Sequence, residues 1–242
     1  LKAAFEGRLV PQDPNDEPII NVMNKFGKKP ISNLELDILP NGWEWTKIGD
    51  ITSNITKVKP KNYFSKEFRY IDISSINNKL HKITKPKTFL PDEAPSRARQ
   101  LVYTNDIVFS TVRTYLENIA LIPESLNEQI ASTGFSVLRV NKLYSHKLLF
   151  YYCLTKKFLQ PLNNLQRGTS YPAVRDGDVR NQPVPIMPIT EQLRLVNEIE
   201  KHLSIYAEIE SSLRIGIFKA NKIYQSILKI AFEGRLTNKN KK

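Results

Sequence analysis

The sequence contains few of the residues from which disulfides, metal sites and catalytic triads are built. Its 242 residues include one cysteine and three histidines. A single cysteine excludes a disulfide within the chain, and Cys153 lies in the apolar run LLFYYCL, which favours a buried core thiol. His81, His146 and His202 stand far apart in unrelated sequence contexts. This spread argues against a metal site or a triad.

Long hydrophobic runs are also absent. No apolar stretch approaches the roughly 20 residues that a membrane helix needs, and the N-terminal LKAAFEGRLV lacks a signal-peptide pattern. We therefore expect a soluble, cytoplasmic protein. Because the first residue is not methionine and the N-terminus resembles the tail of a helix, we interpret the sequence as a fragment or a processed chain.

The sequence lacks the motifs of the enzyme classes that act on DNA. Its nine glycines are scattered, and it has neither the glycine-rich turn and Asn/Asp-Pro-Pro-aromatic motif of an adenine methyltransferase nor the GxxxxGK[ST] loop of an ATP-driven motor. Asp92 and Glu93 follow Pro91, but no acidic-x-Lys strand follows them, so we interpret them as a surface turn and not as a nuclease site. We expect no catalytic residue and no cofactor in this chain.

Positive charge is what the chain has in excess. The formal net charge is +12, and residues 43–188 hold 21 basic against 12 acidic side chains. Nine basic residues fall between Lys57 and Lys87, against only Glu67 and Asp72. Clustered cations release condensed counterions when they meet phosphates, so this segment predicts a polyanionic partner. A merely solvated face is the alternative, and membrane binding is weaker because the stretch has no amphipathic helical period.

An internal repeat defines the organisation of the chain. LKAAFEGRL at 1–9 returns as LKIAFEGRL at 228–236. A period this long indicates duplication of a whole domain with its linker, so the chain holds one unit preceded by the last turns of another. We predict a helix stub and linker at 1–42, a globular domain at 43–188, a long helix at 189–236 and a basic tail at 237–242.

The globular domain is expected to be a mixed α+β domain with a twisted sheet and short helices. Trp43, Trp45 and Ile48 are predicted core residues at its start. Arg97 and Arg99 are weaker contact candidates, because SRARQ also fits a helix surface. Apolar runs bounded by turn formers predict strands at 68–74, 106–112, 118–123 and 134–140, and helical spacing predicts a helix from 146 to 162 that stops near Pro161, with a further short helix near 18–26.

A long C-terminal coiled-coil helix is predicted from Thr190 to about Gly234. Alternating steps of three and four residues connect apolar positions over more than four heptads, which is typical of a coiled-coil seam. Glu210 is the polar exception on this seam, and Gly216 marks a kink or a close helix contact. The predicted pairing residues are Val196, Ile199, Leu203, Tyr206, Leu213, Ile217, Tyr224 and Ile227.

These features together resemble the specificity subunits of type I restriction-modification systems. The resemblance is carried by GWEWTKIGDI at 42–51, GTSYPAVRDGDVRNQPVPIMPITEQ at 168–192, the long helix and the repeated AFEGRL. Met187 departs from the pair of prolines that usually precedes Glu-Gln in this family.

The resemblance implies a non-catalytic protein with target-recognition domains held apart by antiparallel helices. Each domain reads one part of a split double-stranded DNA sequence. Modification subunits, which bind S-adenosylmethionine and methylate adenine, and a motor and nuclease (restriction) subunit assemble on it. Two copies of this chain pairing as a homodimer, or intramolecular pairing in a longer parent chain, would complete the scaffold.

Candidate DNA contacts are basic, hydroxyl and aromatic side chains in predicted loops. KVKPKN is expected to anchor phosphates from a loop. RTY places a guanidinium, a hydroxyl and an aromatic ring where a loop begins, and RGTSY is a polar loop whose glycine lets the backbone approach a ligand; no residue is assigned to a base. The candidates are Lys57, Lys59, Lys61, Lys85, Lys87, Arg113, Thr114, Tyr115, Arg167, Thr169, Ser170 and Tyr171. A surface turn is the other interpretation for each. The alternative function is a coiled-coil assembly protein whose basic domain binds RNA or an acidic protein.

Overall fold

The computed structural model describes residues 1–32 and 36–235. The predicted basic tail at 237–242 and the final helix residue, Leu236, lie outside the described residues. The chain divides into two compact units, Leu1–Val196 (unit 1) and Asn197–Lys242 (unit 2). The long helix α8 (Ile189–Phe232) begins in unit 1 and continues in unit 2.

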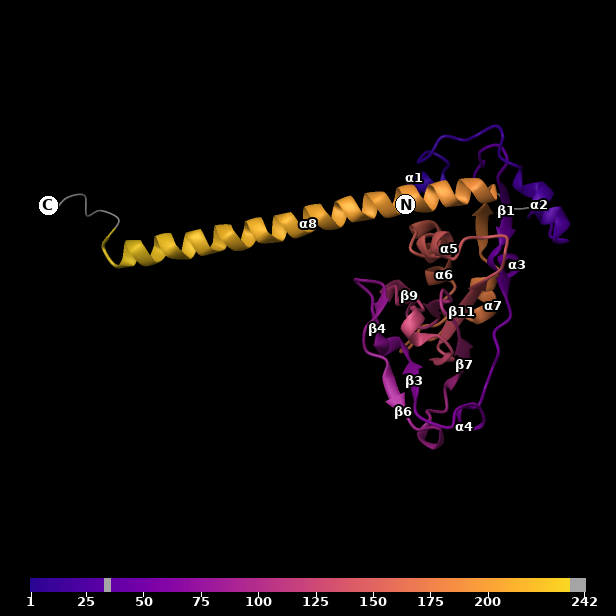
Figure 1. Ribbon diagram of the computed structural model, residues 1–242, viewed down its shortest axis with the longest axis horizontal. Helices are drawn as coiled ribbons and strands as arrows, with labels where there is room; N and C mark the ends of the chain where they lie inside the picture. Colours follow the sequence, from indigo (N-terminus) through magenta and orange to yellow (C-terminus); the bar gives the residue numbers. More distant parts are fainter. Residues whose placement is uncertain (33–35, 236–242) are drawn as a thin grey trace. The chain divides into compact units, whose positions relative to one another are not determined.

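Unit 1 is built from short elements (Figure 1). Its helices before α8 are α1 (Lys2–Phe5), α2 (Ile19–Lys25), α3 (Ile48–Ile51), α4 (Pro60–Tyr63), α5 (His146–Cys153), α6 (Lys156–Asn164) and α7 (Asp176–Arg180), with 3-10 turns η1 (Ile73–Ser75), η2 (Pro91–Glu93), η3 (Thr114–Leu116) and η4 (Glu124–Leu126). Its strands are β1 (Glu44–Lys47), β2 (Thr52–Ser53), β3 (Phe68–Ile71), β4 (Ile76–Asn77), β5 (Lys82–Ile83), β6 (Lys87–Phe89), β7 (Ala98–Val102), β8 (Ile107–Ser110), β9 (Ile119–Leu121), β10 (Gln129–Ser132), β11 (Phe135–Val140) and β12 (Pro183–Ile186).

Two four-stranded sheets form the body of unit 1. One has the order β6-β3-β10-β7 and the other β2-β11-β8-β9. Strand β10 runs antiparallel to β7 and parallel to β3, and the described part of the chain shows no regular βαβ succession. The mixed α+β prediction is therefore confirmed, and each of the four predicted strands overlaps an observed one, namely β3, β8, β9 and β11.

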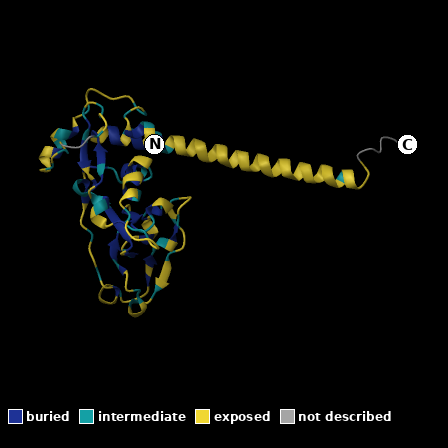
Figure 2. Ribbon diagram, turned by 180° about the vertical axis from the view of Figure 1, so that it is seen from behind, coloured by how far each residue is buried: buried dark blue, intermediate teal, exposed yellow. Residues whose placement is uncertain are grey.

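Apolar burial explains why β8 is central. All four residues of IVFS are buried, and β8 pairs with β11 on one side and β9 on the other. A strand covered on both faces carries a continuous apolar run, because neither face meets water. Val108 on β8 packs in one core cluster with Val137 on β11 and Ala120 on β9. Figure 2 shows this buried centre in dark blue.

A two-stranded ribbon joins the two ends of the globular part of unit 1. Strand β1 pairs antiparallel with β12, placing Trp45 opposite Pro185 and Lys47 opposite Pro183. Prolines cannot donate to a ladder and are confined to strands with a free edge. The carbonyl oxygens of these two prolines instead accept hydrogen bonds from the hydroxyls of Tyr144 and Tyr152, each at 2.9 Å.

The first turn of α8 is hydrogen-bonded into unit 1. The Trp43 indole N–H donates to Glu191 Oε2 at 2.8 Å, and burial raises the pKa of Glu191. The Gln192 amide donates to the carbonyls of Leu143 and Met187, both at 3.0 Å. These contacts anchor the helix start, and they assign a structural role to the Glu-Gln pair of the quoted motif. The predicted core residues Trp43, Trp45 and Ile48 are all buried.

The prediction of one continuous helix from 146 to 162 is wrong. The segment is two helices, α5 and α6, because Thr155 starts a new helix by accepting the Phe158 N–H at its side-chain oxygen. Pro161 does not end the second helix but lies inside it, where one backbone hydrogen bond is missing. Burial of Phe158 and Leu162 holds the helix through this position. Cys153 is buried as expected, and burial raises the pKa of its thiol.

The interpretation of SRARQ as a helix surface is also wrong. Residues 98–102 form β7, with Ala98 and Leu101 buried in the cluster around Phe68. The polar side chains of Arg99 and Gln100 interrupt the apolar run, so the sequence does not show that four of the five strand residues are buried. The short helix expected near 18–26 is confirmed as α2.

In unit 2, α8 presents its predicted seam to solvent. Six of the eight seam residues, from Leu203 to Ile227, are between 45% and 66% exposed, whereas Val196 and Ile199 are buried. The helix is continuous through Gly216, and Glu210 pairs with Arg214 at 2.7 Å. At 1.5 Å per residue its 44 residues span about 65 Å. None of the described helices is long and apolar enough to cross a membrane.

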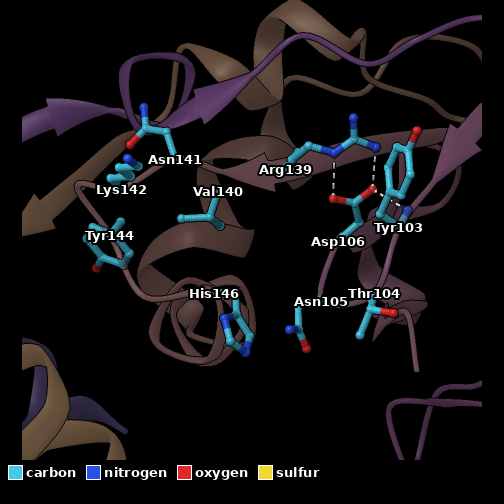
Figure 3. A pocket seen from close by; sticks show the side chains of 10 residues that line it. All are labelled: Tyr103, Thr104, Asn105, Asp106, Arg139, Val140, Asn141, Lys142, Tyr144 and His146. Carbon is cyan, nitrogen blue, oxygen red and sulfur yellow. Dashed lines mark hydrogen bonds and ion pairs between the residues drawn. The ribbon is translucent and has the colours of Figure 1, made fainter. Parts of the chain in front are cut away.

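A partly buried ion pair fixes the turn between β7 and β8. Arg139 on β11 donates to both carboxylate oxygens of Asp106, at 3.0 and 2.7 Å, and its guanidinium lies 4.4 Å from the centre of the Tyr103 ring. The Tyr103 N–H also donates to Asp106 at 2.9 Å. Figure 3 shows this arrangement on one side of a pocket, with His146 on the other.

We predict that Asp106→Asn destabilises the chain by about 3 kcal/mol, because Arg139 would keep its partly buried charge without a carboxylate. Urea denaturation measures the change. Asp92→Asn is the matched control, since Asp92 pairs with Lys61 in full contact with water and its removal should leave the unfolding midpoint unchanged. Equal midpoints for the two variants would contradict the structural role of Asp106.

Candidate nucleic-acid interface

Two predicted contact loops, far apart in the sequence, meet in unit 1. The segment after β8 and the segment after α6 are joined through residues 172–174. Val112 and Arg167 each bridge to Ala173, and the Arg113 N–H donates to the Pro172 carbonyl at 2.7 Å. These backbone bonds bring RTY at 113–115 and RGTSY at 167–171 together.

Arg113 stands at the junction of the two loops. Its backbone is left-handed, with φ 49° and ψ 60°, at the start of η3. Its guanidinium donates to the Ser170 carbonyl at 3.0 Å and lies 4.8 Å from the centre of the Tyr171 ring. The side chain is half-buried, so part of its donor fork remains open to a ligand.

Thr114 is the buried member of this loop. Its hydroxyl donates to Asn163 Oδ1 at 2.6 Å, and its N–H donates to Gln166 Oε1 at 3.3 Å. These bonds tie η3 to α6 and to the segment that follows it. Its neighbour Tyr115 is 51% exposed.

Arg167 is already paired. It donates to Asp178 on α7 at 2.8 Å, and this hydrogen bond holds the pKa of Asp178 below its ordinary value. Half of the Arg167 side chain remains exposed. Gly168, at φ 95°, turns the chain so that Thr169, Ser170 and Tyr171 follow on the surface.

A hairpin that the sequence did not single out borders the same surface. The Asn78 amide, at the turn between β4 and β5, donates to the Leu116 carbonyl of η3 at 2.8 Å. Leu80 in the same turn is 60% exposed, and Lys79 is exposed beside it. The only sequence signal for this hairpin was its density of Asn and Lys, which is shared by many turns.

The five candidate lysines lie elsewhere in unit 1. Lys57 and Lys59 precede α4 and Lys61 lies within it, while Lys85 precedes β6 and Lys87 begins it; all five are exposed. In Figure 1, α4 and β6 lie at one end of unit 1, away from α5 and α6. The candidates therefore form two groups: a loop group around Arg113 and a lysine group around α4 and β6.

Local pairing divides the lysine group further. Lys61 pairs with Asp92 at 2.8 Å and Lys87 with Asp72 at 2.6 Å, and these carboxylates raise the pKa of both lysines. Within residues 1–32 and 36–235, Lys57, Lys59 and Lys85 make no ion pair. Among the five candidate lysines, these three have no carboxylate partner in the described residues. The same ranges contain no group of three or more His, Cys, Asp or Glu placed to hold a metal ion.

Comparison with known proteins gives a consistent result. The family described as Type I restriction modification DNA specificity domain matches residues 40–217. The specificity subunit of the type I restriction enzyme EcoDI from Escherichia coli is 27% identical over 240 residues, covering 98% of this chain and 52% of its own length. The MjaVIII specificity subunit from Methanocaldococcus jannaschii is 23% identical, covering 89% and 51%.

Solved structures agree with the sequence relatives. The HsdS subunit from Thermoanaerobacter tengcongensis is 40% identical with a TM-score of 0.67, covering 72% of this chain and 45% of its own. A chain from a study of complex assembly and conformational transition of the type I R-M system is 35% identical with a TM-score of 0.68, covering 84% and 50%.

The chain spans about half the length of the curated relatives that it matches. The family match covers most of unit 1 and continues into α8, so both the globular part and the helix contribute to it. The chain therefore belongs to the family of type I restriction-modification DNA specificity domains.

Proposed function

We propose that this chain reads one half of a split double-stranded DNA target for a type I restriction-modification complex. The observation that carries the proposal is the family match over residues 40–217, a region that includes both the loop group and the lysine group. Family membership favours this function over an assembly protein that binds RNA or an acidic protein. A DNA substrate also fits a cytoplasmic location.

The two residue groups have different proposed roles. The exposed lysines without carboxylate partners, Lys57, Lys59 and Lys85, suit phosphate contact because ammonium groups act as point charges. The loop group combines Arg113 and Arg167, which carry planar donor forks, with exposed Tyr115 and Tyr171. Guanidinium forks match the acceptor pair on guanine in the major groove.

The chain's partners are proposed on the same basis. We expect modification subunits to bind this chain and to hold S-adenosylmethionine themselves, and a restriction subunit to add to that complex. This chain would contribute recognition and no catalytic group. Mapping methylated adenines in DNA exposed to the chain, its modification subunit and S-adenosylmethionine tests the function directly. Methylation that needs this chain and falls at one defined sequence supports the proposal, and methylation unaffected by its omission overturns it.

We predict that the chain binds duplex DNA with strong salt dependence, and that replacing Lys57, Lys59 and Lys61 together by Gln weakens binding to all sequences alike. Removal of each phosphate contact should lower the slope of log affinity against log salt by about 0.9. Lys61 should contribute least because Asp92 already holds it. Lys25→Gln, an exposed change in α2 outside the basic segment, is the control. Affinity that ignores salt concentration would count against the prediction.

We predict that Arg113→Lys or Arg167→Lys changes preference between DNA sequences by about 1–3 kcal/mol, because lysine keeps the charge but has no bidentate fork. The methylated motif of each variant complex reports the preference, with Lys25→Gln as control. If both variants lose affinity equally on every sequence, the two arginines contact phosphates and not bases.

The exposed seam of α8 is proposed to pair with the same helix of a second copy, antiparallel, or with an equivalent helix in a longer parent chain. Six apolar seam residues exposed along one helix are typical of an unpaired coiled-coil face. In a two-fold antiparallel pair, the recognition units would read inverted half-sites separated by an unread spacer.

We predict that the chain is dimeric at tens of micromolar in sedimentation equilibrium, and that Leu203→Glu combined with Leu213→Glu gives monomers, because both leucines lie on the seam. Lys219→Glu also places a carboxylate on the helix, but off the seam, and should leave the dimer intact. Deleting one heptad should shorten the spacer. If the native chain is monomeric, the seam does not pair with a second copy and belongs to pairing with a helix of a longer parent chain.

A further inference from the structure

The turn that joins β4 to β5 has a fixed backbone. The two strands pair directly before and after it, so residues 78–81 form the loop. The side-chain oxygen of Asn77 accepts the N–H groups of Lys79 and Leu80, both at 3.1 Å, as asparagine commonly does in turns. His81 ends the loop in the left-handed region, at φ 49°. A residue with a Cβ stays in that region only where surrounding contacts impose it.

Two such contacts fasten the turn to the rest of unit 1. On one side, the Asn78 amide donates to the Leu116 carbonyl of η3 at 2.8 Å. On the other side, the His81 ring packs edge-on against Phe150 of α5, with ring centres 6.5 Å apart. Because the turn is held at both ends, the position of Leu80 between them is fixed as well.

An exposed apolar patch results from this arrangement. Leu80 is 60% exposed, and Tyr115 and Leu116 on the adjoining η3 are 51% and 39% exposed. A single exposed leucine is ordinary on a protein surface, whereas apolar side chains gathered on adjoining segments mark a binding surface. We name Leu80, Tyr115 and Leu116 the leucine patch.

Positive charge borders the leucine patch. Residues 73–90, which include the hairpin, carry four lysines and no acidic side chain. Two of these lysines, Lys79 and Lys82, lie on either side of the leucine in the sequence and are exposed. At η3, Arg113 stands at one end and Glu117 at the other. An apolar patch bordered by cations fits a partner that is polyanionic and carries apolar groups between its phosphates, which is the description of duplex DNA.

The grooves of DNA offer a leucine side chain few partners of its own kind. The base edges of the major groove present hydrogen-bond donors and acceptors, and their apolar feature is the C5-methyl group of thymine. The major groove is also wide enough to admit a two-stranded β-ribbon. The bond from Asn78 to η3 sets the hairpin beside Arg113, whose proposed contact is the acceptor pair of guanine in that same groove.

We propose that the β4–β5 hairpin enters the major groove beside the loop group, and that Leu80 reads an A·T pair through the methyl group of thymine. Recognition at this position uses the burial of two apolar groups and no hydrogen bond. The inference rests on the proposed function, because it needs a DNA target. It adds a side chain that selects a base pair which the arginine forks do not.

Deoxyuridine tests the proposal, because its base differs from thymine only by the missing methyl group. The chain and its modification subunit are first shown to methylate a defined sequence, and duplexes of that sequence are then made with one thymine at a time replaced by uracil. Fluorescence anisotropy measures the affinity of the complex for each duplex. Uracil at one thymine of a half-site should lower the affinity about fourfold, the effect of burying one methyl group. The complex with Leu80→Ala should bind both duplexes equally, and uracil in the unread spacer should have no effect.

A matched leucine supplies the control. Leu193 is also 60% exposed but lies on α8, so Leu193→Ala should keep the native ratio of thymine to uracil affinity. Leu80→Met keeps an apolar side chain and should keep most of that ratio. Because Leu80 is mainly exposed, Leu80→Ala should unfold in urea at the native midpoint, which shows that a lost ratio does not come from lost structure.

Separate outcomes contradict the inference and the proposed function. Equal affinity of the native complex for thymine and uracil at every position overturns the inference and leaves DNA recognition intact, and so does a Leu80→Ala complex that keeps the native ratio. If Leu80→Ala weakens both duplexes equally, the leucine acts as a wedge between base steps and does not read the methyl group. If it weakens only the binding of the modification subunit, the leucine patch is a protein contact. A complex that methylates no defined sequence overturns the proposed function and the inference with it.

Discussion

The antiparallel pairing of β1 with β12 is the constraint on which the rest of unit 1 depends. It joins the start and the end of the globular part and leads directly into α8. The ribbon has only two strands, so carbonyl oxygens on its outer side have no strand partner, and the hydroxyls of Tyr144 and Tyr152 donate to those of Pro185 and Pro183. Burial raises the pKa of both tyrosines, so they remain donors even at alkaline pH, where an exposed tyrosine would ionise. The same Tyr152 forms the wall against which Phe5 packs. One side chain therefore contacts both the ribbon and the first copy of the repeat.

A second set of backbone bonds holds the loops of the candidate interface. Residues 172–174 bridge to the segments on either side of them, so the loops at 113–115 and 167–171 are held as one surface. Carboxylates of the same unit partly neutralise the positive charges near this surface. Asp178, for example, pairs with Arg167. Protein carboxylates at such positions orient the cation and reduce indiscriminate attraction to phosphate. Some of the lysines at α4 and β6 have no such carboxylate partner. The cations of unit 1 therefore fall into those held in place by a carboxylate and those that are not.

The sequence predicted those features that depend on local pattern. Apolar runs located β3, β8, β9 and β11, and the seven-residue spacing located α8. Features that depend on distant residues were missed or misassigned. The burial of Thr114 is not visible in the sequence, because Asn163 and Gln166, some fifty positions away, accept hydrogen bonds from its hydroxyl and its N–H. SRARQ has too few apolar residues to indicate a strand. The segment is a strand because β7 pairs with β10. The break between α5 and α6 comes from the Thr155 side chain, which caps the start of α6. The helical spacing of apolar residues continues across this position and gives no sign of the break.

The 3-10 turn η3 has a left-handed residue at each end, Arg113 at φ 49° and Glu117 at φ 53°, and neither is glycine. Such backbone conformations cost of order 1 kcal/mol each for residues with a Cβ, and they persist only where surrounding contacts impose them. Here the buried bonds of Thr114 and the backbone bond from Arg113 to Pro172 impose them. The conformational entropy of this loop is therefore given up when the protein folds and not when a ligand arrives. A loop held in this way presents its side chains in one geometry and does not rearrange to fit a different one.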